Sequence, residues 1–198
     1  MDLTDREEFA RLKEELARYD SRRDTIIKES RDITKLSKQA IYSLHRGETA
    51  TAEAQLSDAE KVIAKLSGEI ADEPTLRTGG FSAGMEEYAE ARAFLHFLKT
   101  GTLLPYKDIK GIEPEEYLGG LSDLTGELMR YAVIRATKRD REAVQKVRDL
   151  VDAIFGEFVQ FDFRNSDLRK KYDSIKYNLQ KIENVLYDLT LNPREVKE

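Results

Sequence analysis

The chain has 198 residues, of which 36% are charged and 40% hydrophobic, and its formal net charge is −5. This balance excludes a globally basic nucleic-acid binder but not a local basic face. The sequence contains no cysteine, which excludes a disulfide framework, a thiolate nucleophile and a cysteine-ligated zinc site.

No stretch of the sequence is apolar enough to predict a signal peptide or a membrane span. We therefore expect a cytoplasmic protein without a membrane partner. The length and the hydrophobic fraction suit one domain with its own core, and we assign residues 1–198 to it.

Six helices are predicted in chain order. No Pro or Gly interrupts the helical pattern from Thr4 to about Arg46, and Gly47 is a natural C-cap. The stretch 72–84, with one Pro and three Gly, is predicted as a loop. The other helices are predicted over residues 51–70, 84–100, 114–137, 140–158 and from a cap at Asn165 or Ser166 to Leu191. Because no segment alternates as a strand would, we expect an all-α bundle of about six or seven long antiparallel helices.

The last predicted helix carries an apolar seam at alternating steps of three and four residues. Its members are Tyr172, Ile175, Leu179, Ile182, Leu186 and Leu189. This seam predicts packing on another helix, either in the core or at a subunit interface. The first predicted helix far exceeds the average length of about 11–12 residues in globular proteins, which favours an oligomer.

Two predicted helices each carry a pair of acids on one face. Glu87 and Glu90 are spaced i, i+3, and Asp123 and Glu127 are spaced i, i+4. At about 100° per residue, Glu87 and Glu90 share their side of the helix with Phe94. Burying an ionised carboxylate without a partner costs several kcal/mol. Two glutamates on a face that should be buried are therefore unexpected unless they have a function.

Carboxylates from two neighbouring antiparallel helices can meet at one point of a bundle. Oxygen-only ligands suit hard cations such as Mg²⁺, Mn²⁺ or Ca²⁺, and Mg²⁺ or Mn²⁺ beside a groove supports phosphodiester hydrolysis. The alternative is ordinary surface acids, with Arg130 simply pairing with Glu127. Neither His45 nor His96 is expected in the site, and His96 lies about 180° around the helix from Glu87. A di-iron site is disfavoured, because neither histidine follows a Glu by three residues as that motif requires.

A basic face is predicted on the first helix, opposite its apolar stripe. It comprises Lys28, Arg31, Lys35, Lys38, Tyr42 and Arg46. These cations can contact a phosphate backbone, and the tyrosine can stack on a base. The alternative is a solvated, lysine-rich face.

Four collinear stretches of the sequence resemble the translin family, and its translin-associated factor X (TRAX) branch most closely. They are KESRDITKLSKQAIYSLHR, EEYAEARAFLHFLKTG, EEYLGGLSDLTGELMR and NSDLRKKYDSIKYNLQKIENVLYDL. The resemblance covers about Asp20 to Leu191, and the EYAEA and DLTGELMR segments point to the factor X branch. The short N-terminus and the compact connector before residue 114 resemble a stand-alone, archaeal member.

The resemblance implies a curved, all-helical subunit that assembles into a closed octameric shell and binds single-stranded RNA or DNA inside it. It also implies an endoribonuclease that depends on Mg²⁺. The catalytic and metal-binding acids carried over by the resemblance are Glu87, Glu90, Asp123 and Glu127. Whether a translin partner exists is left open.

We therefore expect a homo-oligomeric endoribonuclease that uses Mg²⁺ or Mn²⁺ on single-stranded RNA, with single-stranded DNA as a second ligand. Glu127 or Glu90 is the expected general base. The candidate nucleic-acid contacts are Lys28, Arg31, Lys35, Lys38 and Arg130. The alternatives are a protein that holds single strands without cutting them, and a purely structural helical scaffold.

Overall fold

The computed structural model describes residues 5–77, 79–163 and 167–191. Over these ranges the chain forms six α-helices, two short 3₁₀ helices and no strand, which confirms the predicted all-α class. The α-helices are α1 (Arg6–His45), α2 (Thr49–Asp72), α3 (Gly79–Thr100), α4 (Pro114–Thr137), α5 (Arg141–Phe158) and α6 (Asp167–Leu191). The 3₁₀ helices are η1 (Pro74–Leu76) and η2 (Tyr106–Asp108).

Local sequence signals begin several of these helices. The Asp5 carboxylate accepts hydrogen bonds from the backbone N–H groups of Glu7 and Glu8 at the start of α1. Helix α4 begins with a proline at its first position and a capping box between Glu113 and Glu116. The predicted start at Thr4 and the predicted cap at Asn165 or Ser166 lie outside the described residues.

The prediction of a loop over residues 72–84 was wrong in its second half, because α3 begins at Gly79. Phe81 and Met85 are fully buried there, and this burial outweighs the cost of about 1 kcal/mol that a helical glycine carries. Gly84 does not end a loop. It gives α1 room to approach, because a Cβ at this position would lie 3.2 Å from the Cβ of Ile33.

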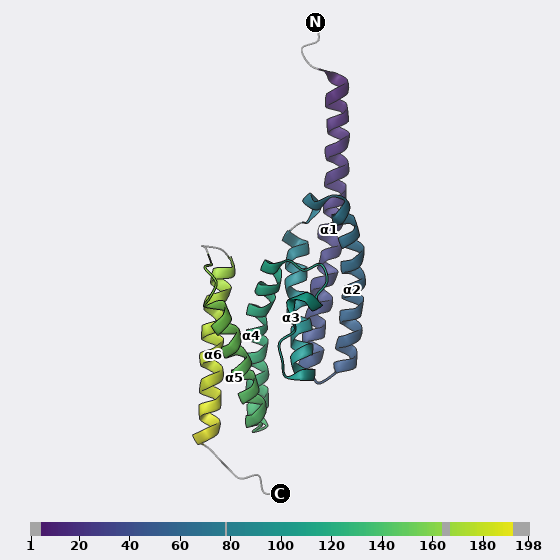
Figure 1. Cartoon of the computed structure of the whole chain (residues 1–198). Coiled ribbons are helices and arrows are strands. Elements are labelled where there is room, and N and C mark those ends of the chain that lie inside the picture. Colours follow the sequence, from purple (N-terminus) through teal and green to yellow (C-terminus); the bar gives the residue numbers. More distant parts are fainter. Residues whose placement is uncertain (1–4, 78, 164–166, 192–198) are drawn as a thin grey trace.

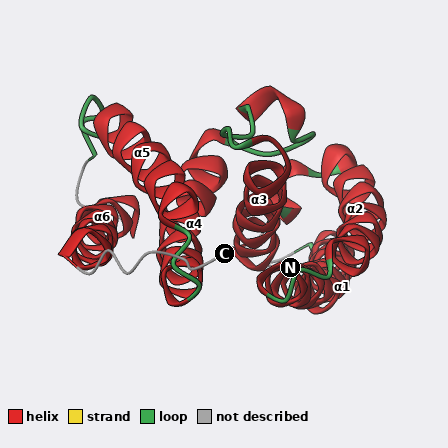
Figure 2. Ribbon diagram, turned by 90° about the horizontal axis from the view of Figure 1, so that it is seen from below, coloured by secondary structure: helices red, strands yellow, loops and turns green. Residues whose placement is uncertain are grey.

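The six helices form two groups of three that meet along α3 and α4 (Figures 1 and 2). In the first group α1 packs on α2 and α3, and in the second α4, α5 and α6 contact one another. The buried side chains are mainly aliphatic and phenylalanine, and the largest fully buried ones include Phe81, Phe94, Phe158, Ile26, Ile33 and Leu128. The described helices contain no apolar stretch of the length that a bilayer crossing needs.

The apolar seam of α6 belongs to the core of the subunit. Ile175, Leu179 and Ile182 are buried, and α6 contacts both α4 and α5. By contrast, the first turns of α1 project beyond the other helices (Figure 1). Phe9 and Leu16 are each 63% exposed on this projection.

Helices α3 and α4 approach each other closely at Gly120. A Cβ at this position would lie 2.7 Å from the backbone oxygen of Glu86 and 2.9 Å from the Cβ of Ala89. Only a glycine therefore fits between the two backbones, and this contact sets how near the side chains of α3 and α4 come to each other.

We expect Gly120→Ala to lower the free energy of unfolding by about 1–3 kcal/mol, because the new methyl group overpacks a backbone contact. The matched control is Gly68→Ala, also within a helix but with open space around the added Cβ. It should raise the free energy of unfolding by about 0.5–1 kcal/mol. Urea denaturation of both variants measures the difference, and equal stabilities would refute the close packing of α3 on α4.

Candidate active site

A cavity of about 500 Å³ is lined by residues of α1, α3, α4 and α6, and all four predicted acids line it. These acids are Glu87 and Glu90 of α3, and Asp123 and Glu127 of α4. The rest of the lining includes Lys38, Tyr42, Arg130, Ser174 and Asn178. The structure therefore brings the two acidic pairs together, as their spacing on neighbouring helices predicted.

Glu90 is the most buried of the four acids. It is 7% exposed, and among the described residues its carboxylate has no hydrogen-bond or ion-pair partner. Burial raises the pKa of Glu90 from 4.5 to about 9, and the negative charges of Glu87, Asp123 and Glu127 add to this effect. At neutral pH the carboxyl group therefore keeps its proton unless a positive charge enters the cavity.

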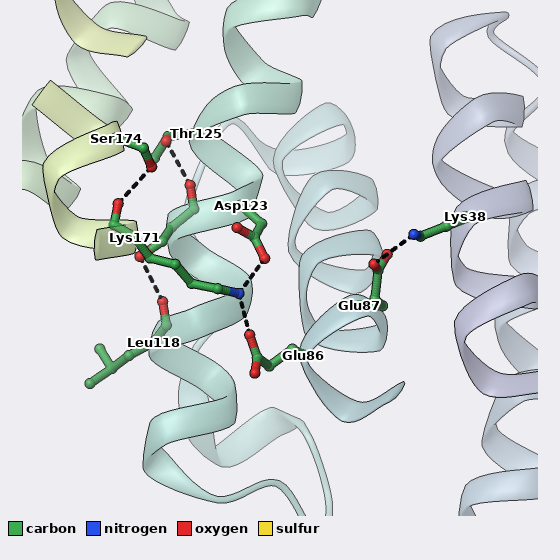
Figure 3. A network of polar contacts seen from close by, with 9 residues as sticks. Lys38, Glu86, Glu87, Leu118, Asp123, Thr125, Lys171 and Ser174 are labelled. Carbon is green, nitrogen blue, oxygen red and sulfur yellow. Dashed lines mark hydrogen bonds and ion pairs between the residues drawn. The ribbon is translucent and has the colours of Figure 1, made fainter. Parts of the chain in front are cut away.

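Two lysines from distant helices contact the acids (Figure 3). The Lys38 Nζ atom of α1 lies 3.1 Å from Glu87 Oε1. The Lys171 ammonium of α6 lies 2.6 Å from Asp123 Oδ2 and also contacts Glu86 of α3. Partial burial lowers the pKa of Lys171, but its hydrogen bonds to Asp123 and Glu86 outweigh this and raise it overall. Lys171 therefore joins three helices beside the cavity.

Neither histidine lines the cavity, but His45 contacts one of its acids from outside the lining. Its Nε2 atom lies 2.6 Å from Glu127 Oε2. This hydrogen bond is the main cause of the lowered pKa of Glu127, and Arg130, 3.7 Å from the same oxygen, adds to it. The other histidine, His96, instead lies with its Nε2 3.1 Å from Thr102 Oγ1.

The predicted basic face divides into two parts. Lys38 and Tyr42 line the cavity itself, as does Arg130 from α4. Lys28, Arg31 and Lys35 are exposed along α1 and form no ion pair with any described residue. Since these positions follow one another at steps of three and four, they continue the face of Lys38 along the helix.

The donor set suits a hard divalent cation, because the four acids offer only carboxylate oxygens. Burial is the main reason that Glu90 stays protonated, and the negative charges of the other three acids, which add to this effect, are what such an ion would neutralise. As the side chains stand, no three acids or histidines of the described residues are grouped so that they could hold an ion. Binding therefore requires the acids to turn away from their protein cations, and Lys38, whose side chain is 63% exposed, is free of packing that would prevent this.

Similar proteins are known in both animals and fungi. The Translin family model matches residues 21–192. The chain is 30% identical to the Translin-associated protein X homolog of Schizosaccharomyces pombe, over 93% of this chain and 88% of that protein. It is 25% identical to Translin-associated protein X of Mus musculus, over 95% of this chain and 79% of that protein.

Two solved structures share the fold. The crystal structure of apo-NeC3PO superposes with a TM-score of 0.83 at 24% identity, covering 91% of this chain and 96% of that chain. The AfC3PO–duplex RNA complex superposes with a TM-score of 0.85 at 21% identity, covering 93% of this chain and 97% of that chain. The all-helical arrangement is therefore common to all three chains.

Proposed function

Because the chain belongs to the translin family, we propose that it is a metal-dependent endoribonuclease that hydrolyses single-stranded RNA. The observation that supports this most is one cavity lined by all four predicted acids. An RNA ligand is also consistent with the similar fold of AfC3PO, whose structure was solved with duplex RNA.

Glu87, Glu90, Asp123 and Glu127 would hold Mg²⁺ or Mn²⁺. When bound, such an ion lowers the pKa of a nearby water and neutralises charge on a phosphate. A general base works best when its pKa lies near the working pH. Without an ion the pKa of Glu90 is about 9, and the positive charge of a bound ion would bring it down towards the working pH, whereas the pKa of Glu127 is already lowered. We therefore favour Glu90 as the group that accepts a proton from the attacking water.

The basic face of α1 would hold the RNA strand. Lys28, Arg31 and Lys35 would contact successive phosphates and lead the backbone towards Lys38 at the cavity. Tyr42 is 57% exposed beside the acids and offers a ring on which a base can stack. Arg130 of α4, which also lines the cavity and lies 3.7 Å from Glu127, would contact a phosphate near the acids.

Lys35→Ala should weaken binding of single-stranded RNA and make it less dependent on salt. Each phosphate contact removed lowers the slope of log affinity against log salt by about 0.7 for a single strand. Fluorescence anisotropy at several salt concentrations measures this slope. Lys61→Ala, an exposed lysine of α2 that pairs with Asp58, is the control, and a slope equal for both variants would contradict the proposed path.

The test of the function is a cleavage assay. Labelled single-stranded RNA is incubated with the protein and Mg²⁺, Mn²⁺ or a chelator, and duplex RNA and single-stranded DNA are run beside it. We expect internal cuts in single-stranded RNA that depend on the metal and stop with the chelator. Cleavage that survives chelation would overturn the metal-dependent mechanism.

A second candidate function is binding of single strands without cleavage. It is favoured by the ion pairs that already engage three of the acids, Glu87, Asp123 and Glu127, with Lys38, Lys171 and Arg130. Retention of RNA without any metal-dependent product would support this function. A protein that shows no salt-dependent RNA binding would instead be a structural scaffold.

We also propose a homo-oligomer and expect an octamer. The exposed apolar side chains on the projecting part of α1, Phe9, Leu12 and Leu16, support a contact with another subunit. Light scattering should give the mass of eight subunits of 22.8 kDa, and a monomer at micromolar concentration would contradict this part of the proposal.

A further inference from the structure

His45 ends α1 and is packed into the protein beside α4. Its side chain is 4% exposed, and its ring lies against Phe94, with ring centroids 4.9 Å apart. Phe94 in turn packs edge-on against Tyr131 at 6.0 Å. The imidazole therefore has little freedom to turn, and its only hydrogen bond within the described residues joins Nε2 to Glu127.

The hydrogen-bonding pattern indicates which ring nitrogen carries the proton. Because the Glu127 carboxylate accepts, Nε2 must donate. Nδ1 is buried and has no hydrogen-bond partner. A proton on Nδ1 would leave a buried donor unpaired, at a cost of about 1–3 kcal/mol. The neutral tautomer with its single proton on Nε2 avoids this cost.

The contacts with Glu127 all fall on one of its two carboxylate oxygens. His45 Nε2 and Arg130 both lie nearest to Oε2, at 2.6 and 3.7 Å. The other oxygen, Oε1, accepts no hydrogen bond from the described part of the chain, and Glu127 lines the cavity. The buried imidazole thus fixes one oxygen and leaves the second available.

We infer that His45 is a positioning residue, which holds Glu127 through Oε2 so that Oε1 serves as a ligand for the divalent cation. This inference rests on the proposed function, because it concerns the same cavity. Partners of this kind, one contact removed from the metal, typically change metal affinity by about 10–100-fold when they are lost.

The first test measures Mn²⁺ binding directly, by electron paramagnetic resonance, without RNA. His45→Phe keeps a ring against Phe94 but lacks the donor, whereas His45→Gln restores an N–H donor. We expect His45→Phe to weaken Mn²⁺ binding about 10–100-fold, and His45→Gln to recover most of the affinity. His96→Phe is the matched control and should bind as the wild type does. In a Glu127→Gln background, His45→Phe should have no further effect.

The second test uses the unaltered protein and does not depend on a variant that folds. The chain has 2 histidines, so ¹⁵N NMR can assign the tautomer of each ring. We expect the proton of His45 on Nε2, and a ring that carries its proton on Nδ1 with none on Nε2 would overturn the inference. If the wild type binds Mn²⁺ and a folded His45→Phe binds it equally well, the inference fails while the proposed function stands. If the wild type binds no Mn²⁺, the proposed function fails and the inference with it.

Discussion

Glu90→Gln should reduce metal-dependent cleavage of single-stranded RNA by about 10²-fold or more. The substitution keeps the shape of the side chain but removes both the negative charge and the base. Glu90 is the most enclosed of the four acids and has no other partner among the described residues, so nothing nearby replaces it. Single-turnover cleavage with saturating Mn²⁺ separates a loss of chemistry from a loss of metal binding.

The control for this variant is Glu115→Gln, an exposed acid in the first turn of α4. It should cleave at the wild-type rate. RNA binding measured with a chelator should be unchanged for both variants, because neither residue belongs to the basic face. A Glu90→Gln protein that cuts as fast as the control would remove Glu90 from the chemistry.

The metal-free protein should become less stable as the pH rises from about 5 to about 9. Below pH 4.5 the Glu90 carboxyl group is protonated in the folded and unfolded states alike. Above it the unfolded state ionises, whereas the folded state keeps its proton up to a pKa of about 9. Unfolding then releases a proton, so this one group lowers the free energy of unfolding by at most about 1.4 kcal/mol per pH unit in that window.

Glu90→Gln should remove this part of the pH dependence and stabilise the metal-free protein at pH 8. Denaturant unfolding at several pH values measures the slope, with Glu115→Gln as the control that keeps the wild-type slope. Saturating Mn²⁺ should restore stability at high pH in the wild type, because the ion compensates the carboxylates. Identical pH profiles for wild type and Glu90→Gln would show that Glu90 ionises freely in the fold.

The helices could be predicted largely from local signals. Breakers such as Gly47 and the proline at the start of α4 mark helix ends whatever the rest of the chain does. The start of α3 could not be predicted in this way, because Gly79 and Gly84 argue against a helix on local grounds. Burial of Phe81 and the close approach of α1 at Gly84 favour a helix in this segment. Both depend on tertiary packing, which local sequence signals do not reveal.

The candidate site, too, could be predicted only in part from the sequence. The four acids could be predicted because they lie in two pairs, each on one helix face. His45 and Lys171 were missed because they are 82 and 48 residues away in sequence from the acids they contact. Helical periodicity relates residues within one helix and does not show which helix packs beside it. In hindsight, both residues lie within stretches that resemble the translin family.

The most direct test of the proposed metal site is the position of Mn²⁺ in a crystal. Anomalous scattering from crystals grown with Mn²⁺ and without chelator locates the ion independently of any assumption about the reaction. The proposal predicts a peak within the cavity, in coordination distance of carboxylate oxygens from both α3 and α4. The proposal is contradicted if protein saturated with Mn²⁺ shows the anomalous peak elsewhere, or shows no peak between Glu90 and Asp123.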